Sequence, residues 1–233
     1  MPLRFMFFTM NKKNSCLILF FLVLTSKSFS QEEDAGLWTS VDIQKKISNN
    51  STLSFSEELR FNENISQLGT AFTEIGFSHK IIKRLTGSIA YRFIQVRQLD
   101  DSYSTRHRLF IDLAYRVKYK KIIFTLRERL QSQVKDVQSS DADLSPQYTS
   151  LRNKLTVKYD TDKKYTPWIA CEMYYQLSNP DGNEIDNMRY SVGVDYKFNK
   201  KNSFTLSYLI NQEVNVNNPL TSYIVAVNYS YSF

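Results

Sequence analysis

The stretch MRYSVGVDYKF, Met188 to Phe198, decides the fold of this chain, because its residues alternate strictly between two chemical kinds. The apolar positions are Met188, Tyr190, Val192, Val194, Tyr196 and Phe198, and the positions between them are Arg189, Ser191, Gly193, Asp195 and Lys197. Side chains of a β-strand point alternately to its two faces, so a period of two predicts a strand with one apolar and one polar face.

The same alternation recurs along the whole chain. It covers residues 37–46, 52–62, 70–81, 86–97, 108–117, 121–133, 150–159, 165–177, 203–213 and 221–233. Strands of soluble sheets average about 5–6 residues, whereas a tilted strand that crosses a membrane needs about 9–11. The length of these segments therefore indicates membrane strands.

The polar faces are rich in charged residues, and if they pointed at water, as in a soluble sandwich, all the apolar faces would have to meet in one core. They hold Glu58, Arg60, Glu74, Arg92, Arg108, Asp112, Arg116, Arg127, Arg129, Arg152, Glu172, Arg189 and Asp195. A closed barrel places these faces around a lumen and the apolar faces in lipid. We therefore predict an all-β fold, an antiparallel transmembrane β-barrel of about 10–12 strands whose lumen these charged residues line.

The connections support the barrel, but the strand count does not fit the usual rule. Short turns (48–51, 82–85, 119–120, 161–164 and 199–202) alternate with longer loops (62–69, 98–104, 134–147, 178–186 and 214–220), as in outer-membrane barrels. Eleven segments are present, whereas single-chain bacterial barrels have even numbers of strands. Either a strand is split or missed, or the N-terminal residues rise through the lumen before turning down.

The N-terminal residues read as a secretory signal. Lys12 and Lys13 precede an apolar run from Cys16 to Leu24, and small residues precede a cleavage site between Ser30 and Gln31. We predict a cleaved signal peptide over 1–30, a barrel domain over 31–233 and the outer membrane of a Gram-negative bacterium as location.

Charge and composition exclude several classes of function. Removing residues 1–30 removes four basic residues and no acid, so the net charge falls from +7 to +3 and argues only weakly for nucleic acid. Two histidines and one remaining cysteine leave no standard zinc site. We expect no metal, no cofactor and no nucleic-acid partner.

The chain ends in the alternating stretch VAVNYSYSF, Val225 to Phe233. Tyr229, Tyr231 and the terminal Phe233 resemble the last strand of outer-membrane barrels, which the barrel-assembly machinery reads during insertion. The plainer interpretation is that Phe233 is the last aromatic residue of the membrane rim.

Several motifs together resemble an uncharacterised family of bacterial outer-membrane β-barrels, known as domain of unknown function 2490. They are GLWTSVDIQKKI at 36–47, SEELR at 56–60, STRHRLFIDLAYR at 104–116, TLRERLQ at 125–131 and SLRNKLTVKY at 150–159. The resemblance covers nearly all of the chain after the signal. It implies a barrel fold, but no activity and no catalytic residues.

The inward arginines suggest two functions. Fixed positive charge in a lumen favours anions, which predicts a small or gated porin-like channel for a small anionic solute. Alternatively, arginines and carboxylates pair across a narrow lumen and plug it, leaving a structural barrel whose partner is membrane lipid. The oligomeric state is open.

Two further classes of function are weighed against the channel. A lipid-modifying enzyme could use His107 at the outer rim, but Leu109 stands where an outer-membrane phospholipase would need serine, and His79 lies toward the other rim. We therefore expect no enzyme. A soluble barrel that binds a hydrophobic ligand would need the apolar faces to point inward.

Three polar residues interrupt the predicted lipid face. They are Glu57, Glu128 and Asn153, of which the last two face each other if Gln133 pairs with Tyr148. A contact with a second subunit or a lipid headgroup would explain them, and so would a β-bulge that shifts the register.

Overall fold

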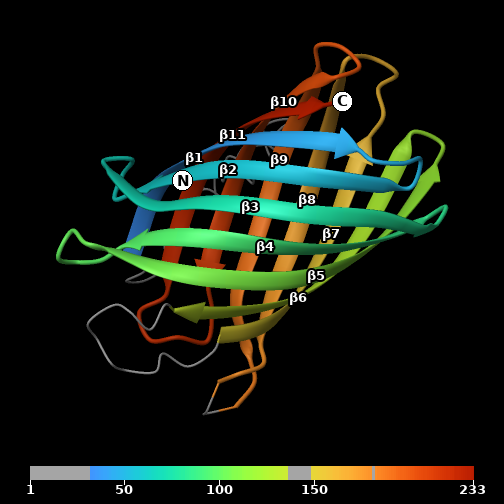
Figure 1. Ribbon diagram of the computed structural model, residues 1–233. Coiled ribbons are helices and arrows are strands. Elements are labelled where there is room, and N and C mark those ends of the chain that lie inside the picture. The colour runs from blue at the N-terminus through green and yellow to red at the C-terminus, as the bar shows by residue number, and fades with distance from the viewer. Residues whose placement is uncertain (1–31, 136–147, 180–181) are drawn as a thin grey trace, which may run out of the picture. The chain divides into compact units, whose positions relative to one another are not determined.

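The computed structural model describes residues 32–135, 148–179 and 182–233, which form a closed barrel of eleven strands (Figure 1). Within these ranges no helix is long and apolar enough to cross a membrane. The strands are β1 (Glu32–Lys46), β2 (Ser51–Asn62), β3 (Gln67–Ile82), β4 (Leu85–Arg97), β5 (Tyr103–Tyr119), β6 (Ile122–Lys135), β7 (Tyr148–Tyr159), β8 (Tyr165–Gln176), β9 (Ile185–Lys197), β10 (Asn202–Glu213) and β11 (Leu220–Ser232). All eleven predicted segments are therefore strands.

A parallel pair closes the barrel. Each strand pairs antiparallel with the next along the chain, and β1 pairs with β11 in parallel from Glu32↔Leu220 to Gln44↔Ser232. Ten hairpins reverse the chain ten times, so the first and eleventh strands must run in the same direction. Among the residues that the structure describes the odd count stands, since no predicted segment is split and no further strand is present; Trp38 lies on a strand that runs from the loop end.

The connections divide the barrel into two ends. The turn end holds residues 47–50, 83–84, 120–121, 160–164 and 198–201, together with Phe233. The loop end holds residues 63–66, 98–102, 177–179, 182–184 and 214–219, together with the start of β1. The loops at 63–66 and 98–102 are shorter than predicted, because β3 and β5 begin earlier than the alternation suggested. The loop at 136–147 lies outside the described residues.

The barrel exposes apolar side chains and buries polar ones, the reverse of the distribution in a soluble protein. Its outer surface exposes large apolar side chains on every strand, for example Ile75, Leu113, Leu126, Val192 and Leu206. The buried polar residues of the inward face include Asp112, Arg129, Gln131, Arg152 and Glu172. Apolar side chains outside and hydrogen-bonded polar side chains inside are the arrangement that a lipid bilayer favours.

Glu128 and Asn153 lie on the outer face of the barrel, as the alternation predicts, because no β-bulge shifts the register of their strands. Glu128 lies opposite Leu113 on β5 and Asn153 on β7, and both ladders are continuous. The three shifts of register occur elsewhere, near Phe61, Ile82 and Tyr175. The bulge hypothesis is therefore wrong for Glu128 and Asn153.

Glu57 has a local partner on the same outer face. Its carboxylate accepts a hydrogen bond of 2.7 Å from the Thr73 hydroxyl on β3. The shift of register in that ladder comes beyond Arg60, so it does not turn Glu57 inward.

Candidate functional site in the barrel lumen

The lumen contains a cavity of about 730 Å³ that most of the predicted charged residues line. Nine of the thirteen belong to its wall: Glu58, Arg60, Arg92, Arg108, Arg127, Arg129, Arg152, Glu172 and Arg189. Glu74 and Asp112 lie behind this wall, where they pair with Arg92 and Arg129. Asp195 pairs with Lys158 nearer the turn end, and Arg116 is exposed at that end.

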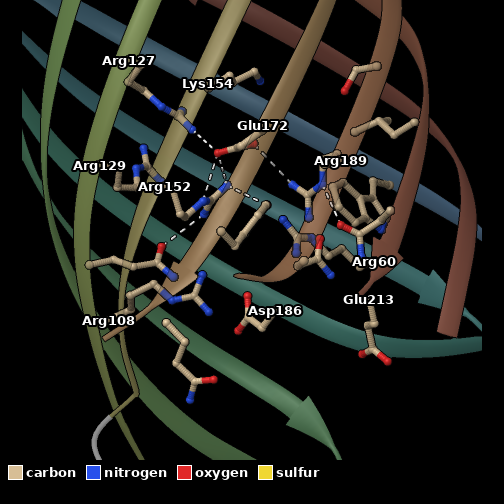
Figure 2. A pocket seen from close by; sticks show the side chains of 18 of the residues that line it. Arg60, Arg108, Arg127, Arg129, Arg152, Lys154, Glu172, Asp186, Arg189 and Glu213 are labelled. Carbon is tan, nitrogen blue, oxygen red and sulfur yellow. Dashed lines mark hydrogen bonds and ion pairs between the residues drawn. The ribbon is translucent and has the colours of Figure 1, made fainter. Parts of the chain in front are cut away.

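Glu172 is the centre of the charged network. Alternation along β8 turns Glu172 inward, and only 2% of the residue is exposed. Its Oε1 accepts hydrogen bonds from Arg127 Nη2 at 2.5 Å and from Arg152 Nε at 3.0 Å (Figure 2). Arg189 Nη1 lies 4.0 Å from the other oxygen. One carboxylate thus faces three guanidinium groups from three other strands, β6, β7 and β9.

Neutral hydrogen-bond acceptors complete the environment of Arg152. Its Nη1 donates to Gln131 Oε1 at 3.1 Å, and its Nη2 donates to the Tyr174 hydroxyl at 2.8 Å. A buried guanidinium is costly unless its donors are satisfied, and these partners satisfy them. Arg152 is therefore held rigidly at the middle of the wall.

Aromatic rings hold the arginines on the other side of the lumen. Arg60 lies 3.8 Å from the Trp38 ring centroid, Arg92 lies 3.7 Å from that of Phe72, and Arg129 lies 3.6 Å from that of Phe110. Phe72 and Phe110 are buried, so these stacks fill the lumen beside β1–β5. Cation–π contacts favour the planar arginine side chain in this role. The remaining space lies mainly against β6–β10.

The cavity wall carries more positive than negative charge. Eight basic side chains line it (seven arginines and Lys154), against four acids, Glu58, Glu172, Asp186 and Glu213. Within the described residues Arg108 donates hydrogen bonds only to the amide oxygen of Gln133, at 3.0 and 2.5 Å. Lys154 lies next to Glu172 in the β7–β8 ladder and has no ion pair within the described residues. The wall of the cavity therefore holds more basic than acidic side chains.

The cavity extends from the loop end of the barrel through its middle. At the loop end Val216 and Asn217 of the β10–β11 connection line it. Toward the turn end its wall includes Trp168, whose indole Nε1 donates to Asp195 at 3.0 Å. The opening is therefore among the loops, and the lining is deepest near Trp168.

Several residues of this wall were not among the predicted ones. Lys154 and Tyr174 stand two positions after Arg152 and Glu172 on the same strands, so alternation alone would have predicted that they face the lumen. Asp186 and Glu213 stand at strand ends, where alternation gives no assignment. The Tyr148 hydroxyl donates to Asp186 at 2.6 Å, a contact between strands 38 residues apart that only the fold reveals.

The C-terminal residues continue the sheet to the last position. Phe233 donates its backbone N–H to Gln44 and accepts a bond from the Lys46 N–H, both at 2.9 Å. The ring of Phe233 stacks on Tyr231, and both side chains, like Tyr229, belong to the outward-facing set. The predicted cleavage site at Ser30 and Gln31 lies outside the described residues.

The histidines do not come together. The His107 ring nitrogen Nδ1 lies 2.6 Å from the Tyr91 hydroxyl on the outer face, and Leu109 follows on that face. His79 contacts Ser51 near the turn end. In the part of the chain that the structure describes, no cluster of three His, Cys, Asp or Glu residues could hold a metal ion.

A closed barrel with an apolar outer surface and an ion-paired lumen defines a class, the transmembrane β-barrels of the outer-membrane type. The family described as "Protein of unknown function (DUF2490)" matches residues 35–221. The chain therefore belongs to this family, which confirms the resemblance seen in the sequence.

Two solved structures are similar to this barrel. The β-domain of the Bordetella autotransporter BrkA has 9% sequence identity and a TM-score of 0.53, over 81% of this chain and 86% of that one. The translocator domain of the autotransporter NalP from Neisseria meningitidis has 15% identity and a TM-score of 0.41, over 71% and 70% of the two chains. At this identity the BrkA likeness extends to the fold alone. Among curated proteins, none matches the chain.

Proposed function

We propose that this protein is a narrow outer-membrane channel that favours small anionic solutes. The observation that carries the proposal is the cavity of about 730 Å³, with eight basic and four acidic side chains in its wall. A wall of fixed positive charge with low-dielectric surroundings raises the local concentration of anions and repels cations.

The ion pairs of the lumen make the channel narrow or gated. The Glu172 network and the stacked arginines cross the middle of the barrel, where a passing solute must displace ordered side chains. Arg108 keeps donors available, because in the part of the chain that the structure describes its hydrogen-bond partner is a single amide, that of Gln133. An anion can exchange contacts with such a guanidinium, whereas a large solute cannot pass this layer.

The proposal places the barrel in the bacterial outer membrane with its turn end toward the periplasm. The long strands, the apolar outer surface and the fold shared with an outer-membrane barrel support that location. The outward Tyr229, Tyr231 and Phe233 act as the signal for the barrel-assembly machinery, and the terminal Phe233 pairs with β1 at the turn end.

The barrel is not an enzyme in this proposal. His107 has a tyrosine neighbour, and Leu109 occupies the position at which a phospholipase of this type would carry its serine. These two observations favour a rim histidine over a catalytic one, and no cofactor enters the proposed function.

Single-channel conductance in a planar bilayer tests the proposal. We expect refolded protein to give discrete current steps. In a KCl gradient the sign of the reversal potential should show that chloride permeates more readily than potassium. Arg108→Gln removes a charge from the cavity wall and should reduce the preference for chloride. The matched control is Arg116→Gln, which removes the same charge from a residue outside the wall.

Two results would contradict the channel. A correctly folded barrel that leaves the bilayer silent would indicate a plugged, structural barrel. Equal loss of anion preference in both variants would show that the net charge of the protein, not the cavity, sets selectivity.

A further inference from the structure

Each of the five short turns either contains two adjacent basic residues or, in the case of the first turn, directly follows them. The pairs are Lys45–Lys46, Lys83–Arg84, Lys120–Lys121, Lys163–Lys164 and Lys200–Lys201, and we call them the dibasic ring. They come from hairpins that follow one another around the barrel, so the charge encircles the turn end (Figure 1). The lumen does not account for them, because none lines its cavity.

The dibasic ring is exposed and largely unneutralised. All ten side chains are exposed, and within the described ranges only Lys121 forms an ion pair, with Asp162 at 2.7 Å. The loop end has the opposite character, since β1 begins with Glu32, Glu33 and Asp34 and the β4–β5 loop carries Asp100 and Asp101. The positive charge is thus concentrated at one end of the barrel.

Three of the ammonium groups lie against rim aromatics that face outward. Lys45 Nζ is 5.7 Å from the Phe233 ring centroid, and Lys120 Nζ is 5.6 Å from that of Tyr119. Lys163 Nζ is 5.9 Å from that of Tyr165. Aromatic residues at the ends of membrane strands lie at the level of the lipid headgroups. The three ammonium groups are therefore held at headgroup level instead of pointing away from the membrane.

One turn keeps its lysine in a conformation that lysine does not favour. Lys120 has a φ of 51° in the two-residue turn between Tyr119 and Ile122, a position where glycine or asparagine is usual. A side chain in this left-handed region costs about 1 kcal/mol or more. The charge at this turn is present despite that local cost.

From these observations we infer that the dibasic ring binds the anionic phospholipid headgroups of the leaflet at the turn end. Each headgroup phosphate would lie between an ammonium group of a turn and the rim aromatics beneath it. The dibasic ring surrounds the barrel, and three of its ammonium groups lie against outward-facing aromatics, as expected of a site for membrane lipid. A site for a soluble anionic polymer would instead be expected on a surface that faces the water. The inference needs the barrel to be in a bilayer, but it does not need the lumen to conduct.

Lipid selectivity of the reconstituted mature barrel tests the inference. Spin-labelled phosphatidylglycerol and phosphatidylcholine are compared by electron spin resonance in phosphatidylcholine vesicles, at low salt and in 0.5 M NaCl. We expect the protein to prefer phosphatidylglycerol about fivefold, the effect of roughly one basic contact per headgroup. High salt should bring the ratio close to one, because it screens exposed charge.

Two triple variants isolate the ring. Lys45→Gln, Lys120→Gln and Lys163→Gln together remove the three aromatic-stacked ammonium groups, and we expect the preference to fall to about twofold or less. The control changes Lys80, Arg116 and Lys197 to Gln, which removes the same charge from exposed residues of the turn end that face the lumen. The control should keep the preference of the unaltered protein.

Three results would overturn the inference. Equal association of both lipids with the unaltered protein would show that the ring has no lipid role. An equal fall in both variants would assign the effect to net charge. Binding of isolated anionic cell-wall polymer to the barrel, without any lipid preference, would assign the ring to that polymer. Silent bilayers in the conductance experiment would leave this preference untouched.

Discussion

Replacing Glu172 with glutamine should destabilise the barrel more than any other single change of charge in the lumen. The side chain is almost fully buried and lies within 2.7 Å of both Arg127 and Arg152, with Arg189 at 4.0 Å. The amide keeps an acceptor but removes the negative charge, so buried guanidinium groups lose their counter-ion. Removing one partner of a buried pair costs about 3–5 kcal/mol, a large part of a typical stability of about 5–15 kcal/mol.

Urea unfolding of the micelle-embedded barrel measures this loss. The chain has two tryptophans, Trp38 and Trp168, and both line the lumen cavity, so their fluorescence reports its exposure. The matched control is Glu58→Gln, because Glu58 has one ion pair among the described residues, with Arg60 at 2.6 Å, and its side chain is 19% exposed. We expect the control to lose about 1 kcal/mol.

A double-mutant cycle with Arg152→Gln separates the ion pair from the rest of the environment. Removing both charges should cost less than the sum of the two single changes, with a coupling of at least about 1 kcal/mol. If Glu172→Gln costs no more than Glu58→Gln, or if the coupling is zero, Glu172 does not organise the lumen as argued above.

Three further predictions concern other parts of the barrel. Thr39→Cys with Val227→Cys, in a Cys171→Ser background, should form a disulfide across the parallel β1–β11 pair, since paired Cα atoms of neighbouring strands lie within bridging range. The control pair, Thr39→Cys with Val225→Cys, should stay reduced. The opposite pattern on a non-reducing gel would contradict the register. Glu128→Leu should raise the free energy of unfolding by about 1 kcal/mol, because an acid on the lipid face is destabilising; a loss of stability would indicate that its carboxylate contacts a headgroup or a second copy. The hydrogen bond from Lys118 holds the pKa of Asp160, in the turn after β7, below its ordinary value of 3.8. The stabilising effect of this bond is thus present above the ordinary pKa and is lost as the pH falls through the pKa of the folded state. Lys118→Met should raise the midpoint at which the Asp160 carboxyl titrates, as measured by carbon NMR.

The sequence by itself determined the strands and their faces. Alternation from Met188 to Phe198 is a local property, because each residue's neighbours at two positions away share its face whatever the rest of the chain does. The same rule predicted that the side chains of Arg152 and Glu172 face the lumen, and both line its cavity in the structure. It also predicted that Glu57 and Glu128 face outward, and the register of their strands agrees. Segment length then separated membrane strands from those of a soluble sheet.

Only the tertiary structure decided how the strands close and how the charges pair. The parallel contact of β1 with β11 joins residues almost 190 positions apart, and no local pattern marks it. Parity can place Arg127, Arg152 and Arg189 inward, but that they converge on Glu172 depends on the register of four neighbouring strands. Register across a sheet is set by the closure of the whole barrel, so alternation along single strands cannot contain it.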